Sequence, residues 1–333
     1  MSSVDNSFLA MDVRLGNGIH LPGCDLRLDP RRKVPLAVVS HAHSDHAGWH
    51  TVTIASFATI DLMKARKPVP SGCTLIELDY GETYCTDRAR ITLLPAGHIL
   101  GSAQVLVETE EGRLLYTGDF KRRESLTCEE AASAKAGTLV MECTFGHLRY
   151  AFPPVERVRE EILNFCRQSL SEGVTPILLA YSLGKSQELL AILAGSAMEV
   201  AVHRSVGVMS AVYGKHGVDL GKYTLWDGKN HTGKVLIIPP NTRLSGQKVE
   251  KSRSAVISGW AMDSSAIYRN RCDAAFPLSD HADHGELIEH VEETGAKKVF
   301  TVHGFTEEFA GDLRALGIDA LALGGGNQLE LFR

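Results

Sequence analysis

The stretch His41-Ala42-His43-Ser44-Asp45-His46 places three imidazoles and one carboxylate within six consecutive residues. Imidazole and carboxylate groups without thiolates suit zinc or manganese in a hydrolytic site. The apolar residues 34–39 precede this cluster and are expected to form a buried strand. The cluster then falls at the carboxyl end of a strand, where functional sites of α/β folds lie. The alternative interpretation is a solvated polar loop.

Four further apolar segments lead into a residue that can bind a metal. Residues 90–94 lead to His98, residues 114–118 to Asp119, residues 138–141 to Glu142 and residues 298–302 to His303. A buried strand is normally followed by turn-forming residues, so repeated delivery of ionisable groups indicates one shared site.

These residues are sufficient for two divalent ions that share a bridging carboxylate. We expect zinc, and manganese is an alternative because His and Asp ligands bind both ions. Such a pair of ions would activate a water molecule and neutralise charge on a phosphoryl oxygen. The assignment is His41, His43 and His98 to a first metal, Asp45, His46 and His303 to a second, and Asp119 to the bridge.

Composition and charge restrict the classes of partner. The chain has 333 residues, 44% of them hydrophobic, which is enough for one large or two medium domains. The net charge of -5 gives no overall attraction for a polyanion, so nucleic acid would be held by local basic runs. The candidates are Arg31-Arg32-Lys33, Lys121-Arg122-Arg123 and residues 248–253, each of which could equally be a solvated surface.

Cysteine usage and hydropathy indicate the compartment. The seven cysteines are scattered without C-x-x-C spacing, which argues against a disulfide framework and against a thiolate zinc site. Residues 1–10 lack the pattern of an export signal, and no apolar run is long enough to span a membrane. We therefore expect a cytoplasmic protein that does not bind a membrane.

The middle of the chain has an α/β alternation of its own. A helix is expected after Pro153-Pro154, strands over residues 175–180, 234–238 and 254–258, and a helix over residues 187–193. We interpret residues 155–265 as an inserted domain, flanked by residues 1–154 and 266–333, which together form the metal-binding domain.

The start of the helix over residues 187–193 is a candidate substrate contact. Ser182 and Lys185 stand at its amino terminus, where backbone N–H groups and a cation could bind one phosphate of a nucleic acid. A purely structural helix cap is the alternative.

Six motifs in order resemble those of metallo-β-lactamase-fold nucleases of the β-CASP group, across essentially the whole chain. They are residues 41–46, Gly97-His98, Thr117-Gly118-Asp119-Phe120, Glu142-Cys143-Thr144-Phe145-Gly146, Ser279-Asp280-His281-Ala282-Asp283 and Val302-His303-Gly304. Within that group the chain looks most like the bacterial DNA ligase-associated exonucleases, also called RNA-processing exonuclease-like or mRNA 3′-end-processing-factor-like proteins. Residues 22–30, 180–185 and 277–281 carry this second likeness.

The resemblance implies an α/β fold, classed as α+β in some schemes: a four-layer αββα domain with an inserted, reduced β-CASP-like cap. It implies that substrate enters between the two domains. It also implies that His281 protonates the leaving oxygen, that Glu142 orients His281, and that Asp29 supports the metal-binding loop. Asp45 joins Glu142 and His281 as a catalytic residue. His284, three residues after His281, could exchange roles with it.

The expected function is that of a metal-dependent phosphodiesterase, an exonuclease on single-stranded DNA or RNA, in DNA repair or RNA processing. The family resemblance adds a DNA ligase and a helicase as partners. The alternative is a small-molecule hydrolase of the same fold, acting on a thioester or lactam, which needs the metal cluster but no general-acid histidine. A non-catalytic scaffold is a third possibility, although every expected ligand is present.

Overall fold

The computed structural model describes residues 10–229, 231–240, 242, 249 and 251–324 of the chain. The amino-terminal residues 1–9 and part of the basic run 248–253 lie outside the described residues. Contacts divide the chain into two compact units. Unit 1 comprises Met1–Arg123, Glu129–Ala151 and His281–Arg333, and unit 2 comprises Glu124–Cys128 and Phe152–Asp280.

Unit 1 contains two sheets. The first has six strands in chain order, with β1 to β3 antiparallel and β3 to β6 parallel. Its strands are β1 (Arg14–Gly16), β2 (Gly18–Leu21), β3 (Leu26–Leu28), β4 (Leu36–Val38), β5 (Val52–Ser56) and β6 (Thr74–Leu78), with a 3-10 turn at Pro22–Cys24.

The second sheet of unit 1 has seven strands in the order β19-β18-β11-β10-β9-β8-β7. Strands β7 to β10 form an antiparallel meander, and β10, β11, β18 and β19 are parallel. The strands are β7 (Thr83–Cys85), β8 (Arg90–Pro95), β9 (Ala103–Thr109), β10 (Gly112–Tyr116), β11 (Thr138–Cys143), β18 (Lys298–Gly304) and β19 (Asp319–Ala322).

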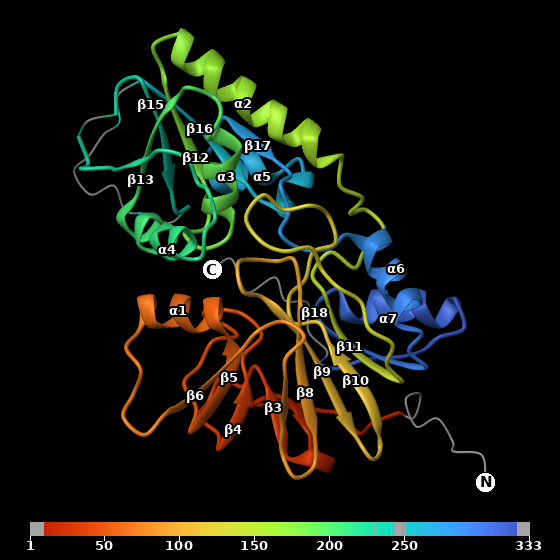
Figure 1. Ribbon diagram of the computed structural model, residues 1–333. Helices are drawn as coiled ribbons and strands as arrows, with labels where there is room; N and C mark the ends of the chain where they lie inside the picture. The colour runs from red at the N-terminus through yellow and green to blue at the C-terminus, as the bar shows by residue number, and fades with distance from the viewer. Residues whose placement is uncertain (1–9, 230, 241, 243–248, 250, 325–333) are drawn as a thin grey trace. The chain divides into compact units, whose positions relative to one another are not determined.

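The alternation of side chains along the strands builds two cores in unit 1. Leu114 and Tyr116 of β10 face a core shared by both sheets, whereas Leu115 between them faces a second core. Helix α6 (His284–Thr294) contacts β11, and α7 (Thr306–Ala315) contacts β18 and β19 on that second side (Figure 1). Helix α1 (Phe57–Arg66) contacts β5 and β6 of the first sheet. The expected four-layer αββα arrangement is confirmed.

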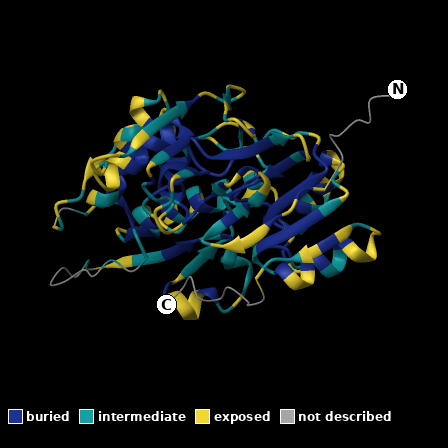
Figure 2. Ribbon diagram, turned by 90° about the horizontal axis from the view of Figure 1, so that it is seen from below, coloured by how far each residue is buried: buried dark blue, intermediate teal, exposed yellow. Residues whose placement is uncertain are grey.

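Unit 2 contains a parallel sheet of six strands in the order β14-β13-β15-β12-β16-β17. Its inner strands are mostly buried, as is usual for a parallel sheet, whereas the edge strand β14 is exposed; Figure 2 colours buried residues dark blue. The strands are β12 (Thr175–Leu179), β13 (Glu199–Val202), β14 (Thr224–Leu225), β15 (Lys234–Ile238), β16 (Ser252–Ile257) and β17 (Ala274–Phe276). The helices are α2 (Val155–Ser171), α3 (Lys185–Leu193), α4 (Arg204–Lys215) and α5 (Ala266–Asn270), with a 3-10 turn at Gly259–Met262.

The local predictions largely match these bounds. Helix α2 begins directly after Pro153-Pro154, and each of the five strands expected before a ligand residue is present. Unit 2 extends to Asp280 rather than to the expected boundary at residue 265, because β17 pairs with β16 and completes the same sheet. Among the described residues, no helix is both long and apolar enough to cross a membrane.

Candidate metal centre

The predicted ligands of unit 1 meet at one edge because their strands run in the same direction. Strand β8 is antiparallel to β9 and β9 to β10, so β8 and β10 share a direction, and β11 and β18 are parallel to β10. His98 follows β8, Asp119 follows β10, and Glu142 and His303 lie at the ends of β11 and β18. The ionisable groups therefore gather at the carboxyl ends of these strands.

A close approach of the two sheets brings in the residues that follow β4. Gly118, which precedes Asp119, has a φ of +54°, and a Cβ at this position would lie 2.7 Å from Ser40 Cβ. Ser40 precedes His41, so only a residue without a side chain permits this contact. The glycine thus places Asp119 beside His41.

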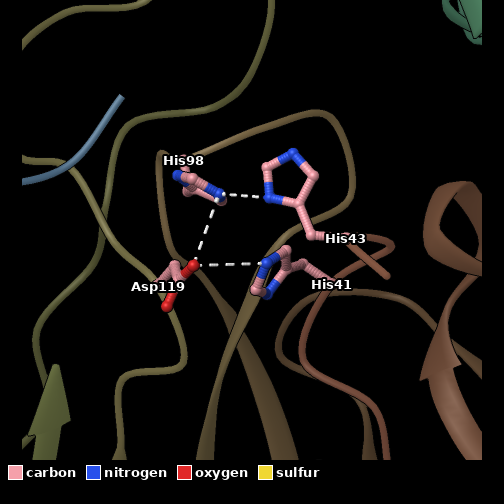
Figure 3. A group of neighbouring side chains, drawn as sticks. All are labelled: His41, His43, His98 and Asp119. Atoms are coloured by element: carbon pink, nitrogen blue, oxygen red, sulfur yellow. Dashed lines mark hydrogen bonds and ion pairs between the residues drawn. The ribbon is translucent and has the colours of Figure 1, made fainter. Parts of the chain in front are cut away.

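The first ligand set is compact. The ligand atoms of His41, His43, His98 and Asp119 all lie within 4.8 Å of one another. His41 Nε2 is 3.4 Å and His98 Nε2 3.8 Å from Asp119 Oδ2, and His98 Nε2 is 3.0 Å from His43 Nδ1 (Figure 3). Three imidazoles and one carboxylate are a donor set suited to zinc.

Burial supports the metal interpretation of this set. His41 is fully buried, and among the described residues its Nε2 has no hydrogen-bond partner. A buried polar atom without a partner is unfavourable, and a cation bound there would remove this cost. Burial, together with the neighbouring His46, holds the pKa of His41 well below its usual value, so the ring stays neutral as a metal ligand must.

The second ligand set surrounds the other oxygen of Asp119. His46 Nε2 is 3.5 Å from Asp119 Oδ1 and 3.7 Å from Asp45 Oδ2. The His303 ring lies beside that of His46, with a centroid separation of 5.2 Å. Asp119 therefore presents one oxygen to each set, which is what a bridging carboxylate does. Among the described residues, Asp45, His46 and His303 do not form a group as tight as the first set.

The surroundings of His46 favour a positive charge at this position. Burial lowers its pKa, but Asp119 and Asp29 outweigh that effect and raise the pKa to about 10. The imidazolium proton thus occupies a place where two carboxylates stabilise a cation. A metal ion would compete with that proton.

Asp29, for which the resemblance implies a supporting role, contacts His46 of the second ligand set. Its carboxylate accepts hydrogen bonds from His46 Nδ1 at 2.8 Å, Tyr116 Oη at 2.8 Å, Ser40 N at 2.6 Å and Ser40 Oγ at 2.5 Å. The bond to Nδ1 directs the Nε2 of His46 towards Asp119. Ser40 and Tyr116 escaped the sequence analysis. Ser40 has only its place beside His41 as a signal, and Tyr116 looks like any strand aromatic.

Two residues at this edge have an unusual backbone. Asp29 and His303 have positive φ angles of 47° and 58°. A left-handed conformation costs a non-glycine residue about 1–2 kcal/mol, and such residues cluster at functional sites. The hydrogen bonds of Asp29 retain this conformation.

Glu142 and His281 form a hydrogen-bonded pair beside the ligand sets. Glu142 is fully buried, and its Oε1 lies 2.7 Å from His281 Nδ1. Glu142 also accepts from Phe120 N at 3.2 Å and from Thr144 N at 2.9 Å. Burial raises its pKa, but the charge and hydrogen bond of His281 outweigh burial, and the pKa is lowered. An ionised Glu142 holds the proton on Nδ1 and leaves Nε2 to face outward.

His281 is the histidine of this motif that reaches the cluster. Its ring lies 4.6 Å from the His98 ring between centroids, and its side chain is 18% exposed. His284 Nε2 instead lies 2.9 Å from Asp312 Oδ2, and its ring packs on Phe309 of α7. The structure therefore separates the two candidates, and His281 is the one near the ligands.

The predicted substrate contacts lie in unit 2. Lys185 is buried at the start of α3, and its Nζ donates to Leu278 O at 2.8 Å and lies 2.8 Å from Asp280 Oδ1. Ser182 is partly exposed, and its carbonyl accepts from Gln187 Nε2 at 3.1 Å. These contacts match the structural alternative for Lys185. Phosphate binding by Ser182 and Lys185 stays a prediction.

Comparison with known proteins gives partial matches to nucleic-acid enzymes. The chain is 44% identical over 326 residues to a protein of Opitutus terrae named probable DNA ligase, which covers 96% of this chain and 32% of that protein. It is 31% identical over 192 residues to the transcription termination factor FttA of Methanothermobacter thermautotrophicus, covering 47% of this chain and 30% of that protein.

A third relative is a ribonuclease by name. The RNase aCSPSF2 of Saccharolobus solfataricus is 29% identical over 191 residues, which are 49% of this chain and 38% of that protein. The chain spans about a third of the length of these relatives. No family model matches the chain.

Proposed function

Because the chain belongs to the β-CASP group of metallo-β-lactamase-fold nucleases, we propose that it is a metal-dependent phosphodiesterase, an exonuclease on DNA or RNA. The observation that carries the proposal is the buried Glu142 bonded to His281, 2.7 Å apart, beside the histidine cluster. A thioester hydrolase has no need for an acid at this position, because a thiolate departs without protonation.

The ligand residues would hold two divalent ions, zinc or manganese. His41, His43 and His98 would hold one, Asp45, His46 and His303 the other, and Asp119 would bridge them. When bound, the ions supply activation of a water nucleophile and neutralise charge on the phosphoryl group.

His281 would act as the general acid. Hydrolysis breaks the bond between phosphorus and the leaving oxygen, and the proton on His281 Nε2 would move to that oxygen. Glu142 stabilises the protonated ring, because an adjacent carboxylate raises the proton affinity of an imidazole. The fixed Nδ1–Glu142 bond holds the ring in one orientation, which proton transfer requires.

Unit 2 would serve as the reduced β-CASP-like cap of this nuclease. A ligase is the partner that the comparisons suggest, because nearly the whole chain matches a third of a protein named a probable DNA ligase. We propose that cleavage by this chain prepares nucleic-acid ends for a ligase in DNA repair, with a helicase as a further partner of the same pathway.

The experiment uses end-labelled single-stranded DNA and RNA of one sequence, each with zinc or manganese. We expect shortening of at least one labelled strand in the presence of metal and none after chelation. Asp119→Asn serves as the inactive control, because it removes the bridging charge from both ligand sets. If neither nucleic acid is cleaved while a thioester is hydrolysed, the small-molecule alternative replaces this proposal.

A further inference from the structure

A cavity of about 420 Å³ in unit 1 opens directly onto the second ligand set. Asp45, His46 and His303 line it. The turn between β1 and β2 and the residues Arg31 and Arg32 also line it. The cavity thus joins the metal centre to one of the basic runs found in the sequence.

The side chains of Arg31 and Arg32 are not engaged in ion pairs or hydrogen bonds within the described part of the chain. Both are exposed, and neither guanidinium has an ion-pair or hydrogen-bond partner among the residues that the structure describes. The second basic run is different: Arg122 makes two bonds of 2.6 Å to Glu293, and Arg123 pairs with Asp283 and Glu286. Of these two runs, only the first leaves its arginine side chains available to a ligand among the described residues.

The backbone that presents the arginines is fixed. Asn17 Oδ1 accepts from Arg32 N at 2.8 Å, and Asn17 Nδ2 donates to Arg32 O at 2.9 Å. Gly18 beside it has a φ of +74°, and a Cβ there would lie 2.8 Å from Pro30 Cα. The turn and the loop therefore pack closely, and the backbone that carries the two arginines is fixed beside the cavity.

The nearby carboxylate Asp29 does not cancel the arginine charges. It lines the cavity, as does Asp45 of the second ligand set, but Asp29 is buried and its oxygens face Ser40, His46 and Tyr116. The two exposed arginines can therefore meet an anion in the cavity. The planar guanidinium fork matches phosphate oxygens in geometry as well as in charge.

We infer that this cavity is a subsite for one nucleoside monophosphate unit, with its phosphate held by Arg31 and Arg32. The volume lies near the lower end of the range of about 300–1,000 Å³ for ligand sites, which suits one nucleotide rather than a longer strand. The inference deepens the proposed function: the unit would be the terminal nucleotide on one side of the cleaved bond, and mononucleotides would be the product.

The test measures binding of AMP and dAMP to the metal-loaded protein by calorimetry, with adenosine as the probe without phosphate. The double variant Arg31→Ala/Arg32→Ala should weaken binding of at least one monophosphate by tenfold or more and leave its metal content unchanged. The double variant with lysine should recover part of the affinity, because charge remains while the fork is lost. Arg88→Ala, an exposed arginine in the β7–β8 turn, is the matched control and should bind normally.

Unaltered monophosphate affinity in the alanine double variant overturns the subsite, as does equal weakening in Arg88→Ala. Failure of the subsite and failure of the proposed nuclease function give different results in these experiments. Arginine-dependent binding without nucleic-acid cleavage supports the subsite and rejects the nuclease. Cleavage of DNA or RNA to oligonucleotides, at an unchanged rate in the double variant, keeps the nuclease and rejects the subsite.

Discussion

Both units bury charged side chains, but they do so in opposite ways. In unit 2, Glu188 of α3 accepts from Ser125 Oγ at 2.8 Å, from Thr127 Oγ1 at 3.2 Å and from Arg159 at 3.2 Å. In unit 1, the buried His41 Nε2 has no hydrogen-bond partner among the described residues, and Asp119 and Asp29 raise the pKa of His46 to about 10. The first arrangement is complete by itself, whereas the second favours a bound cation.

The difference gives a rule for recognising a site. Burial of a polar group identifies neither a structural nor a functional role, since Glu188 and Asp119 are both buried. What separates them is whether the protein's own groups satisfy the demand for charge and hydrogen bonds. Substitutions at the ligand residues of unit 1 should therefore remove activity, and substitution of Glu188 in unit 2 should reduce stability.

The largest effect is expected from Asp119→Asn. Loss of the bridging charge should lower nuclease activity by about 10⁴-fold, because both ligand sets depend on this carboxylate. Metal content measured by mass spectrometry should fall with activity, while the folded structure persists in circular dichroism. Full activity in this variant would contradict the two-set assignment.

A loss of about 10³-fold is expected from His281→Gln, within the range of general-acid catalysis. Metal content should be unchanged, because His281 belongs to neither ligand set. His284→Gln is the matched control: the same substitution three residues on, where the ring contacts Asp312 instead. A second measurement is the rate with a substrate whose leaving group needs no protonation. There His281→Gln should approach the rate of the native protein, and a persistent deficit would reject the acid role.

Glu188→Gln should reduce stability by about 3 kcal/mol, a factor of about 10² in the folding equilibrium, because the charge of the buried Glu188 is lost and the partly buried Arg159 keeps only Glu124 as an ion-pair partner. Activity per folded molecule should be retained. Glu161→Gln is the control, since the exposed Glu161–Arg157 pair on α2 contributes at most about 0.5 kcal/mol. Urea denaturation of both variants makes the comparison. Equal stability of the two would show that burial does not matter here.

The smallest effect is a pH dependence of stability in unit 1. His290 is fully buried on α6, and burial, with Arg122 next, lowers its pKa to about 4. The depressed value means that stability is complete above the unfolded pKa of about 6.5 and declines as pH falls towards 4. The contribution lost by pH 5 is about 2 kcal/mol. His290→Phe should flatten this part of the denaturation profile; an unchanged slope would assign it to other groups.

The candidate ligands could be found in the sequence because each lies within a few residues of an apolar strand. Strand periodicity located His98, Asp119, Glu142 and His303, and the density of imidazoles located the residues from His41 to His46. The pairing of His281 with Glu142 was implied by the family resemblance. It is consistent with the 2.7 Å contact between His281 Nδ1 and Glu142 Oε1.

The other features of the site and the fold depend on contacts between residues that are far apart in the sequence, which no local sequence pattern reveals. Tyr116 and Ser40 bind Asp29 through hydroxyl groups that resemble those of any other strand residue. Lys185 looked available for phosphate, but its partner Asp280 is distant in sequence and only the folded sheet brings them together. The end of unit 2 was placed too early for the same reason, since the pairing of β17 with β16 is not local.

The contact of Gly118 with Ser40 has a consequence for folding. The ligands come from β4 of one sheet and from β8, β10 and β18 of the other, so a bound ion would cross-link two layers that otherwise meet through apolar packing. An ion that binds only the native chain stabilises it in proportion to the logarithm of its free concentration. Metal supply would then set the lifetime of the folded enzyme in addition to its rate, and metal starvation would remove the protein through unfolding and proteolysis.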